Sequence, residues 1–345
     1  MIDLRSDTVT LPPKGMKDAI YNAELGDDVF SEDPTINELE PMAADLMGME
    51  SALLVPSGTM ANLVGLLSHC ERGDEVILGH LAHTFLYEAG GISAFGGIHS
   101  RQLVNQSDGT LLLPEIEAAI RYPNDHFPPT KLICLENTHN LCNGTPLKKD
   151  YILKVVEIAK KNRLKMHVDG ARIFNASVAL GTAPSDLNEG IDSVSFCLSK
   201  GLSSPIGSLL CGSIKFIKKA RRIRKALGGG MRQGGIVAAA GKYALEQMVS
   251  RIPEDHRLAK KLSEGLVKIN SINLDPTDIK TNIIYFDFES EGHSDQELLD
   301  TMKAKGILFL ATGPRKFRMV THSCVSDTDI DYTIKELANF LGEKQ

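Results

Sequence analysis

The sequence of 345 residues contains no tryptophan, few aromatic residues (6%) and no apolar run of bilayer length. A transmembrane helix needs about 20 consecutive apolar residues, so we expect no association with a membrane. Basic residues are not in excess either, since 38 Lys and Arg stand against 44 Asp and Glu and the net charge is −6. Nucleic-acid-binding proteins generally carry a basic surface, so we expect no nucleic-acid partner.

The cysteines lack the close spacing of a zinc site or a disulfide framework, so we expect free thiols in a reducing compartment and no metal site. The first seven residues carry acidic charge at Asp3 and Asp7. They lack the apolar core of a secretory signal and the acid-free character of a transit peptide. We therefore expect a cytoplasmic protein. The cysteines are Cys70, Cys134, Cys142, Cys197, Cys211 and Cys324.

Short apolar runs alternate with helical patterns between about residues 50 and 212, which is typical of βαβ units. Such units build a mainly parallel sheet that is buried on both faces, so we expect an α/β fold. Ligands of these sheets bind beyond the carboxyl ends of the strands. The expected strands are 52–55, 75–78, 131–135, 165–168, 193–198 and 208–211, and the expected helices are 57–67 and 150–162.

A glycine run at 228–230 and Pro253 separate this region from a later segment of different character. A helix of small residues is expected over 236–248. The later segment predicts strands at 283–288 and 317–320 and helices at 297–305 and 328–341. We therefore expect a large domain over residues 1–250, with an N-terminal arm at 1–25, and a smaller α/β domain over 251–345.

The segment Pro56-Ser57-Gly58-Thr59 joins an expected strand to an expected helix. A helix start offers free backbone N–H groups, a positive dipole end and, here, two hydroxyls to an anion such as a phosphate. Serine or threonine at a helix start is more often only a cap. The segment lacks the Gly-Lys-Ser/Thr ending of a nucleotide-binding P-loop. Taken alone, it leaves both interpretations open.

Asp169 and Lys200 also follow expected strands. A carboxylate there is either a solvated turn residue or a group that keeps the ring nitrogen of pyridoxal phosphate protonated. A lysine there is either a solvated loop residue or a desolvated amine, whose lowered pKa favours Schiff-base formation. Arg172 is either a surface residue or a ligand of a substrate carboxylate. The order of anion cradle, carboxylate and amine is typical of an enzyme with an aldehyde cofactor.

With these residues identified, the chain resembles the L-threonine aldolases, a family of fold-type I pyridoxal-phosphate lyases, from end to end. The resemblance implies the fold-type I architecture, with a mainly parallel seven-stranded sheet in the large domain. One mild departure is Phe30, which stands where the family commonly has tyrosine. The resemblance rests on motifs that occur in one order: residues 3–10, 26–35, 55–62, 136–140, His167-Val168-Asp169-Gly170-Ala171-Arg172, 228–233 and 320–322.

The resemblance also implies roles for residues at matching positions. Lys200 is expected to hold pyridoxal 5′-phosphate covalently, and Asp169 is expected to pair with its ring nitrogen. His83 is expected to stack on the ring, and His126 to approach the substrate hydroxyl from a neighbouring subunit. The phosphate is expected to contact Ser57, Gly58 and Thr59, together with Lys225 and Arg232 of a neighbouring subunit. The substrate carboxylate is expected to contact Ser6, Arg172 and Arg318.

The implied reaction is the retro-aldol cleavage of L-threonine and L-allo-threonine to glycine and acetaldehyde, with other L-3-hydroxy-amino acids as further substrates. Such an enzyme serves threonine catabolism and glycine biosynthesis. The candidate catalytic residues are Lys200, Asp169, His83 and His126, and either histidine, or a water, can be the base. Some family members hold a cation near Thr8 and Thr10, which the sequence does not establish here.

A site completed by a neighbouring subunit requires at least a dimer, and relatives are tetramers. Two alternatives stay open at this point. One is another fold-type I activity, such as an aminotransferase, a β-eliminating lyase or a serine hydroxymethyltransferase. The other is a cofactor-binding relative without catalytic activity, against which the presence of Lys200, Asp169 and both arginines argues.

Overall fold

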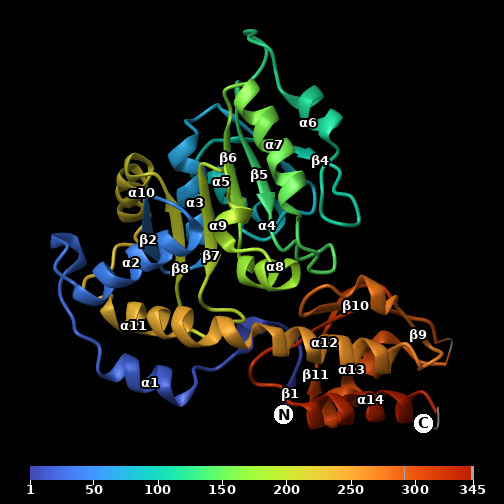
Figure 1. Ribbon diagram of the computed structural model, residues 1–345. Helices are drawn as coiled ribbons and strands as arrows, with labels where there is room; N and C mark the ends of the chain where they lie inside the picture. The colour runs from blue at the N-terminus through green and yellow to red at the C-terminus, as the bar shows by residue number, and fades with distance from the viewer. Residues whose placement is uncertain (291, 343–345) are drawn as a thin grey trace.

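A computed structural model describes residues 1–290 and 292–342, so residues 291 and 343–345 of the expected small domain lie outside the described part. Its larger sheet has the strand order β2-β8-β7-β6-β5-β3-β4 (Figure 1). Neighbouring strands are parallel except at β8, which is antiparallel to β2 and β7. The expected seven-stranded, mainly parallel sheet is confirmed. Its strands are β2 (Ser51–Val55), β3 (Glu75–Gly79), β4 (His99–Leu103), β5 (Thr130–Glu136), β6 (Lys165–Asp169), β7 (Ser193–Cys197) and β8 (Ser208–Gly212).

Strand β4 is the member of this sheet that the sequence does not predict. Its sequence, His-Ser-Arg-Gln-Leu, contains no apolar run, and none of its residues is fully buried. It lies at the edge of the sheet and pairs only with β3. Its side chains are only partly buried or exposed, so the strand carries no apolar run that hydrophobic patterning could reveal.

Successive residues of each strand face opposite sides of the large sheet, and helices cover both sides. Leu54 packs into the core cluster on one side, whereas Leu53 packs into the cluster on the other side. This alternation follows from the two-residue repeat of a strand. The first side is covered by α2 (Pro34–Met47), α6 (Leu113–Ala119), α7 (Lys149–Lys161), α8 (Ile173–Leu180), α9 (Pro184–Leu187) and α11 (Gly235–Tyr243), and the second by α3 (Gly58–His69), α5 (Gly91–Ala94) and α10 (Ile214–Ala226).

The C-terminal part contains an antiparallel sheet of order β12-β13-β10-β9, which packs with three helices around a second apolar cluster. The predicted strands and helices of this segment occur within two residues of the expected positions. Helix α14 begins at a capping box formed by Ser326 and Asp329. The elements are β9 (Ile272–Asn273), β10 (Ile283–Phe288), β12 (Leu310–Gly313), β13 (Lys316–Val320), α12 (Ile252–Leu266), α13 (Asp295–Ala304) and α14 (Asp327–Phe340).

The N-terminal segment connects the two parts of the chain. Strand β1 (Ile2–Asp3) pairs in parallel with β11 (Ile307–Leu308), and Figure 1 shows the two side by side near the N-terminus. Leu4 is fully buried in the second cluster. The 3₁₀ turn η1 (Asp7–Val9) follows and leads towards the large sheet. The segment then continues to α1 (Lys14–Tyr21), which packs on α11.

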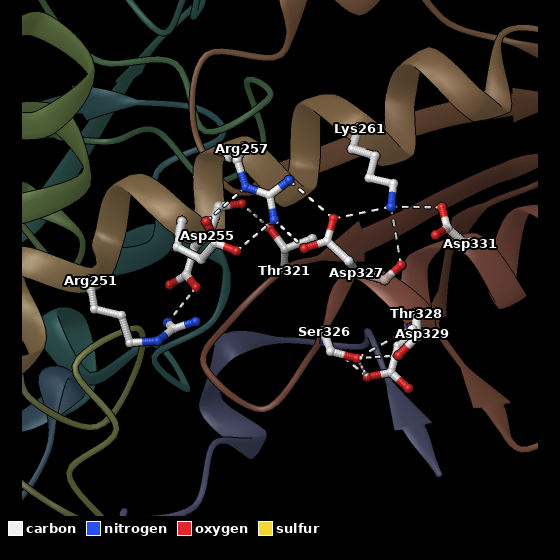
Figure 2. A network of polar contacts seen from close by, with 11 residues as sticks. Arg251, Asp255, Arg257, Lys261, Thr321, Ser326, Asp327, Thr328, Asp329 and Asp331 are labelled. Carbon is white, nitrogen blue, oxygen red and sulfur yellow. Dashed lines mark hydrogen bonds and ion pairs between the residues drawn. The ribbon is translucent and has the colours of Figure 1, made fainter.

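Ion pairs fasten the start of α14 to α12 (Figure 2). Arg257 pairs with Glu254 on its own helix and with Asp327. Lys261 lies 3.1 Å from Asp327 and 2.7 Å from Asp331. These groups are about half-exposed, so solvent screens each pair and its contribution to stability is small.

Two further features of the structure concern membrane-spanning helices and the cysteines. No helix within residues 1–290 and 292–342 combines the length and the apolarity that crossing a bilayer requires. All six cysteines are free thiols, and five of them are buried.

Candidate functional site

A pocket of ≈ 180 Å³, which we call the inner pocket, lies beyond the carboxyl ends of β6 and β7 and against the first turn of α3. This is the edge at which ligands bind in open α/β sheets. The residues that line it are Gly58, Thr59, Asn62, His83, Glu88, Asp169, Ala171, Cys197, Ser199 and Lys200. The sequence-predicted residues Gly58, Thr59, His83, Asp169 and Lys200 therefore lie together.

Asp169 ends strand β6 and is buried at the wall of the inner pocket. Its Oδ1 accepts a hydrogen bond from the backbone N–H of Ala171 at 3.0 Å. Its Oδ2 accepts one from the side-chain Nδ2 of Asn62 at 2.8 Å. Both carboxylate oxygens are thus held in place, one by the donor of Ala171 and the other by that of Asn62.

Asn62 connects this carboxylate to a second one. Its Nδ2 also donates to Glu88 Oε1 at 2.8 Å, so its Oδ1 must be an acceptor. That oxygen lies 2.7 Å from Ser195 Oγ and 3.3 Å from His167 Nε2. Because Asn62 Oδ1 cannot donate, the Nε2 atom of His167 carries the proton.

The hydrogen bonds continue from His167 in the same direction. Its Nδ1 lies 2.8 Å from Ser193 Oγ, whose other contact is His69 Nε2 at 2.7 Å. Burial lowers the pKa of His167 to about 4 and that of His69 to about 3, so both rings are neutral. His69 therefore donates to Ser193, which donates to His167. In this series of hydrogen bonds, which runs from His69 to Asn62, each donor is directed towards Asp169.

His83 begins α4 (His83–Leu86), where its backbone N–H donates to Glu136 Oε2 at 2.7 Å. Its Nδ1 lies 2.9 Å from Glu88 Oε1. Burial alone lowers the pKa of His83, but the hydrogen bond with Glu88 and the charge of Asp169 outweigh burial, and the net pKa is raised. The imidazole is therefore oriented by a carboxylate through Nδ1, which leaves Nε2 for other contacts.

Glu88 is buried beside the inner pocket, and only one of its two carboxylate oxygens has hydrogen-bond partners among the described residues. Burial, together with the nearby Asp169, raises the pKa of its carboxyl against the hydrogen bonds from His83 and Asn62. Its Oε2 is buried without a hydrogen-bond partner among the described residues. Potential ligand atoms of His83, Glu88 and Asp169 all lie within 4.8 Å of one another. The inner pocket is therefore lined by two carboxylates, of Glu88 and Asp169, and by one imidazole, of His83.

Ser57 is the N-cap of α3, and its Oγ accepts a hydrogen bond from the N–H of Met60 at 3.2 Å. The residue acts as a cap, and the following N–H groups of the first turn lack intrahelical acceptors. A Cβ atom on Gly58 would lie 2.7 Å from Cys197 Sγ, so the close approach of α3 to β7 requires glycine. The helix start is thereby brought to the inner pocket, where an anion can bind.

Lys200 follows β7 and is half-buried between the inner pocket and a second, outer pocket of ≈ 470 Å³. His83 also lines both pockets, so the two spaces meet at these residues. The carbonyl of Lys200 accepts a hydrogen bond from Thr10 Oγ1 at 3.0 Å. This bond ties the lysine loop to the N-terminal segment.

The outer pocket brings together residues from both parts of the chain, and it includes all three of the positions expected to hold a substrate carboxylate. Arg172 is buried, and its Nε and Nη2 each lie 2.7 Å from an oxygen of Asp7. This pair lowers the pKa of Asp7 to about 2 in spite of burial, which by itself raises it. The residues that line the outer pocket are Ser6, Thr8, His83, Tyr87, Asn140, Leu141, Arg172, Lys200, Leu310, Ala311, Thr312 and Arg318.

Four expected site residues do not line either of these pockets within one chain: Ser57, His126, Lys225 and Arg232. His126 is exposed and lies in the loop before β5. Arg232 is exposed and pairs with Asp27 at 2.9 Å. Lys225 is exposed at the end of α10. Two other arginines of that basic helix, Arg221 and Arg224, instead pair with Asp28.

The polar residues of the site to which the sequence assigned no role include Asp7, Asn62, Glu88 and Asn140. Asn62 could have been suspected, because it is a buried amide within an otherwise apolar helix face. Glu88 follows His83 by five residues and gives no comparable signal. The contacts of Asp7 and Asn140 join segments far apart in the sequence, which no local pattern predicts.

Comparison with known proteins agrees with this geometry. The sequence matches the family of beta-eliminating lyases over residues 3–289. It is 48% identical to the probable low-specificity L-threonine aldolase 2 of Arabidopsis thaliana over 96% of this chain and 95% of that protein. It is 46% identical to the low specificity L-threonine aldolase of Escherichia coli (strain K12), over 94% and 95% respectively. The solved structure of Leishmania major threonine aldolase superposes with a TM-score of 0.82 at 17% identity, covering 99% of this chain and 100% of that one.

Proposed function

This chain belongs to the beta-eliminating lyase family and, within it, to the low-specificity L-threonine aldolases, and we propose that it cleaves L-threonine and L-allo-threonine to glycine and acetaldehyde. The fold is the fold-type I arrangement that the sequence predicts. The observation that carries the proposal is the junction of the two pockets at Lys200. Asp169 lies on the inner side, and Arg172 and Arg318 lie on the outer side.

The inner pocket fits pyridoxal 5′-phosphate as cofactor. Lys200 offers an amine, Asp169 offers a fixed acceptor for a ring N–H, and the start of α3 at Gly58 and Thr59 offers backbone donors for a phosphate. The buried and unpartnered Oε2 of Glu88 indicates that this space is shaped for a polar ligand. When bound, the cofactor supplies the electron sink for the bond that breaks.

We propose that Arg172 and Arg318 hold the α-carboxylate of the substrate in the outer pocket, together with Ser6. Asp7 uses Nε and Nη2 of Arg172, so the remaining donor atom, Nη1, faces Asn140 and the ligand side. Fixing the carboxylate against these groups determines which bond of the substrate faces the cofactor. Orientation of this kind accounts for a large part of the acceleration in many enzymes.

The reaction also needs a group that accepts the proton of the β-hydroxyl. We propose that His83 Nε2 accepts it, directly or through a water, because Nδ1 is committed to Glu88 and the raised pKa makes the ring more basic. The hydroxyl loses its proton, the Cα–Cβ bond breaks with its electron pair left on Cα, and acetaldehyde departs. Protonation of Cα then completes glycine. His126 is exposed within one chain, so any part it plays is from a neighbouring subunit.

We propose that the enzyme is a homo-oligomer of dimers in which Lys225, Arg232 and His126 complete the site of the neighbouring subunit. Their exposure within one chain, and that of Ser57 and Thr59, supports this arrangement. Large apolar side chains of the N-terminal region are exposed as well, which favours a covered surface there. They include Leu11, Tyr21, Leu25, Val29 and Phe30.

We further propose that residues 1–250 and 251–345 act as a large and a small domain, with Arg318 brought to the site by the small one. The separate apolar cluster of the C-terminal part supports this division. The free thiols favour a reducing compartment. Threonine catabolism that supplies glycine is the pathway that the proposed reaction serves.

Rates on L-threonine, L-allo-threonine and L-serine, measured with purified protein and added cofactor, test the proposal. We expect acetaldehyde and glycine in equal amounts from both threonine isomers. A parallel reaction with a 2-oxo acid measures amino transfer, and release of pyruvate from L-serine measures β-elimination. Amino transfer or pyruvate release without acetaldehyde would overturn the proposal in favour of another fold-type I activity.

A further inference from the structure

The side chain of Asn140 lies between the two arginines of the outer pocket. Its Oδ1 accepts hydrogen bonds from Arg172 Nη1 at 3.4 Å and from Arg318 Nη1 at 3.2 Å. The oxygen must face the arginines, because the amide nitrogen would set donor against donor. One neutral acceptor atom therefore bridges two guanidinium groups.

The backbone of Asn140 is anchored on both sides. Its N–H donates to Glu136 Oε1 at 2.9 Å, and its carbonyl accepts a hydrogen bond from Tyr285 OH at 3.2 Å. Glu136 ends a strand of the large sheet, whereas Tyr285 belongs to β10 of the C-terminal sheet. Because its main chain is fixed, Asn140 can set the separation of the two arginines.

The charges around this bridge are unequal. Arg172 is neutralised by Asp7 through the buried bidentate pair. Arg318 donates to the carbonyl of Arg5 and to Asn140 Oδ1, which are both neutral, and its Nε is buried without a partner. Within residues 1–290 and 292–342, no carboxylate forms an ion pair with Arg318. The bridge therefore leaves the positive charge of Arg318 without a counter-ion at the outer pocket.

We propose that Asn140 is a specificity-determining residue for the α-carboxylate of the amino-acid substrate, an inference that rests on the proposed function. Its oxygen spaces the two guanidinium groups for one carboxylate and adds no negative charge of its own. A carboxylate side chain at the same position would occupy the bridge as an internal anion. It would neutralise Arg318 and repel the incoming carboxylate.

The test is Asn140→Asp, studied by absorbance titration of the holoenzyme with glycine and with glycinamide, which lacks the negative charge. We expect the Kd of glycine to rise at least about tenfold, because one charge pair of this kind is worth over 1.4 kcal/mol. The Kd of glycinamide should change much less. KM for L-threonine should rise with the Kd of glycine, whereas kcat should fall far less.

The matched control is Asn143→Asp, which makes the same substitution in the same loop. Asn143 lines a neighbouring pocket and has no hydrogen bond to Arg172 or Arg318. We expect it to leave the Kd of both ligands unchanged. Equal affinities for glycine in the Asn140→Asp variant and the wild type would overturn the inference. So would an equal loss for glycine and glycinamide, which indicates a general distortion of the pocket.

A second variant covers the case in which Asn140→Asp does not fold or does not retain the cofactor. Asn140→Ala removes the bridging oxygen without adding charge, and we expect glycine to lose affinity relative to glycinamide. An unchanged ratio of the two Kd values would contradict the proposal. Failure of the wild type to release acetaldehyde from L-threonine, or to bind cofactor, instead counts against the proposed function, so the two failures are distinguishable.

Discussion

Arg172 and Asp7 form a buried bidentate ion pair, with both N···O distances at 2.7 Å, although 165 residues separate them in the sequence. Their side chains are 5% and 0% exposed. A buried pair of this kind fixes the orientation of its side chains more than it adds net stability. Removing one partner, however, leaves the other charge buried without a counter-ion, which is strongly destabilising. The N-terminal segment therefore fixes the arginine that we propose to bind substrate.

Replacing Asp7 by asparagine leaves the guanidinium of Arg172 without a counter-ion. We expect a loss of about 3–5 kcal/mol in the free energy of unfolding, and a higher KM for L-threonine because Arg172 loses its orientation. Urea unfolding and steady-state kinetics measure the two effects. Asp327→Asn removes two exposed ion pairs, with Arg257 and Lys261, as a control, and we expect a much smaller loss of stability without a change in KM.

The same variant makes a prediction about pH. The pKa of Asp7 is about 2 in the folded protein, below its ordinary value of 3.8. The stabilisation is therefore complete above pH 3.8 and is lost as the pH falls towards 2. The difference in stability between the wild type and Asp7→Asn should shrink over this range. A constant difference would contradict the assigned ion pair.

Glu88→Gln tests whether Glu88 raises the pKa of His83. The hydrogen bond with Glu88 is the main effect that raises the pKa of His83 against burial. A neutral amide removes this effect, so we expect the pKa of His83 to fall. Because a base must be neutral to accept a proton, the acid limb of the pH profile of kcat/KM should move to lower pH. An unmoved limb would exclude His83 as the titrating base.

The series of hydrogen bonds that ends at Asp169 predicts the protonation state of His167 and His69. Burial holds the pKa of His167 near 4 and that of His69 near 3, and both rings should carry their proton on Nε2. Nuclear magnetic resonance of protein labelled at histidine should therefore show two neutral Nε2–H rings at pH 6. Asn62→Ala removes the link to Asp169, and we expect it to weaken cofactor binding. A charged His167 at pH 6 would contradict the assigned series of hydrogen bonds.

Asp255 on α12 has the opposite pH dependence to Asp7. Its Oδ1 accepts a hydrogen bond from Arg251 at 2.6 Å, as Figure 2 shows, but its Oδ2 is buried without a partner among the described residues. Burial raises the pKa of Asp255 to about 6, against the lowering effect of Arg251. The folded state then binds more protons than the unfolded state between pH 3.8 and 6, so stability falls as the pH rises through this window.

Asp255→Asn should remove that dependence. The wild type should lose about 2–3 kcal/mol from this group between pH 4 and 7, whereas the variant should lose correspondingly less. Unfolding free energies at the two pH values measure the effect. Asp331→Asn, in the exposed part of the same network, is the control and should keep the slope of the wild type. Identical slopes for Asp255→Asn and the wild type would refute the raised pKa.

The sequence predicts the elements and residues that depend on local patterns. Buried parallel strands appear as apolar runs, and Asp169 and Lys200 stand out because they follow such runs. The edge strand β4 is polar and gives no such signal. The bridge at Asn140 joins it to Arg318 across 178 residues, and Glu88 reaches Asn62 across 26. Contacts of this kind arise only when the fold brings separate segments together, so motifs alone did not assign these residues a role.

The most direct test of the account is reduction of the holoenzyme with borohydride, followed by mass spectrometry of its peptides. We predict that a pyridoxyl group is found on Lys200 and on no other lysine. Lys200→Ala should lose both the label and the cleavage of L-threonine. A label on a different lysine, or full activity in the Lys200→Ala variant, would contradict the central claim.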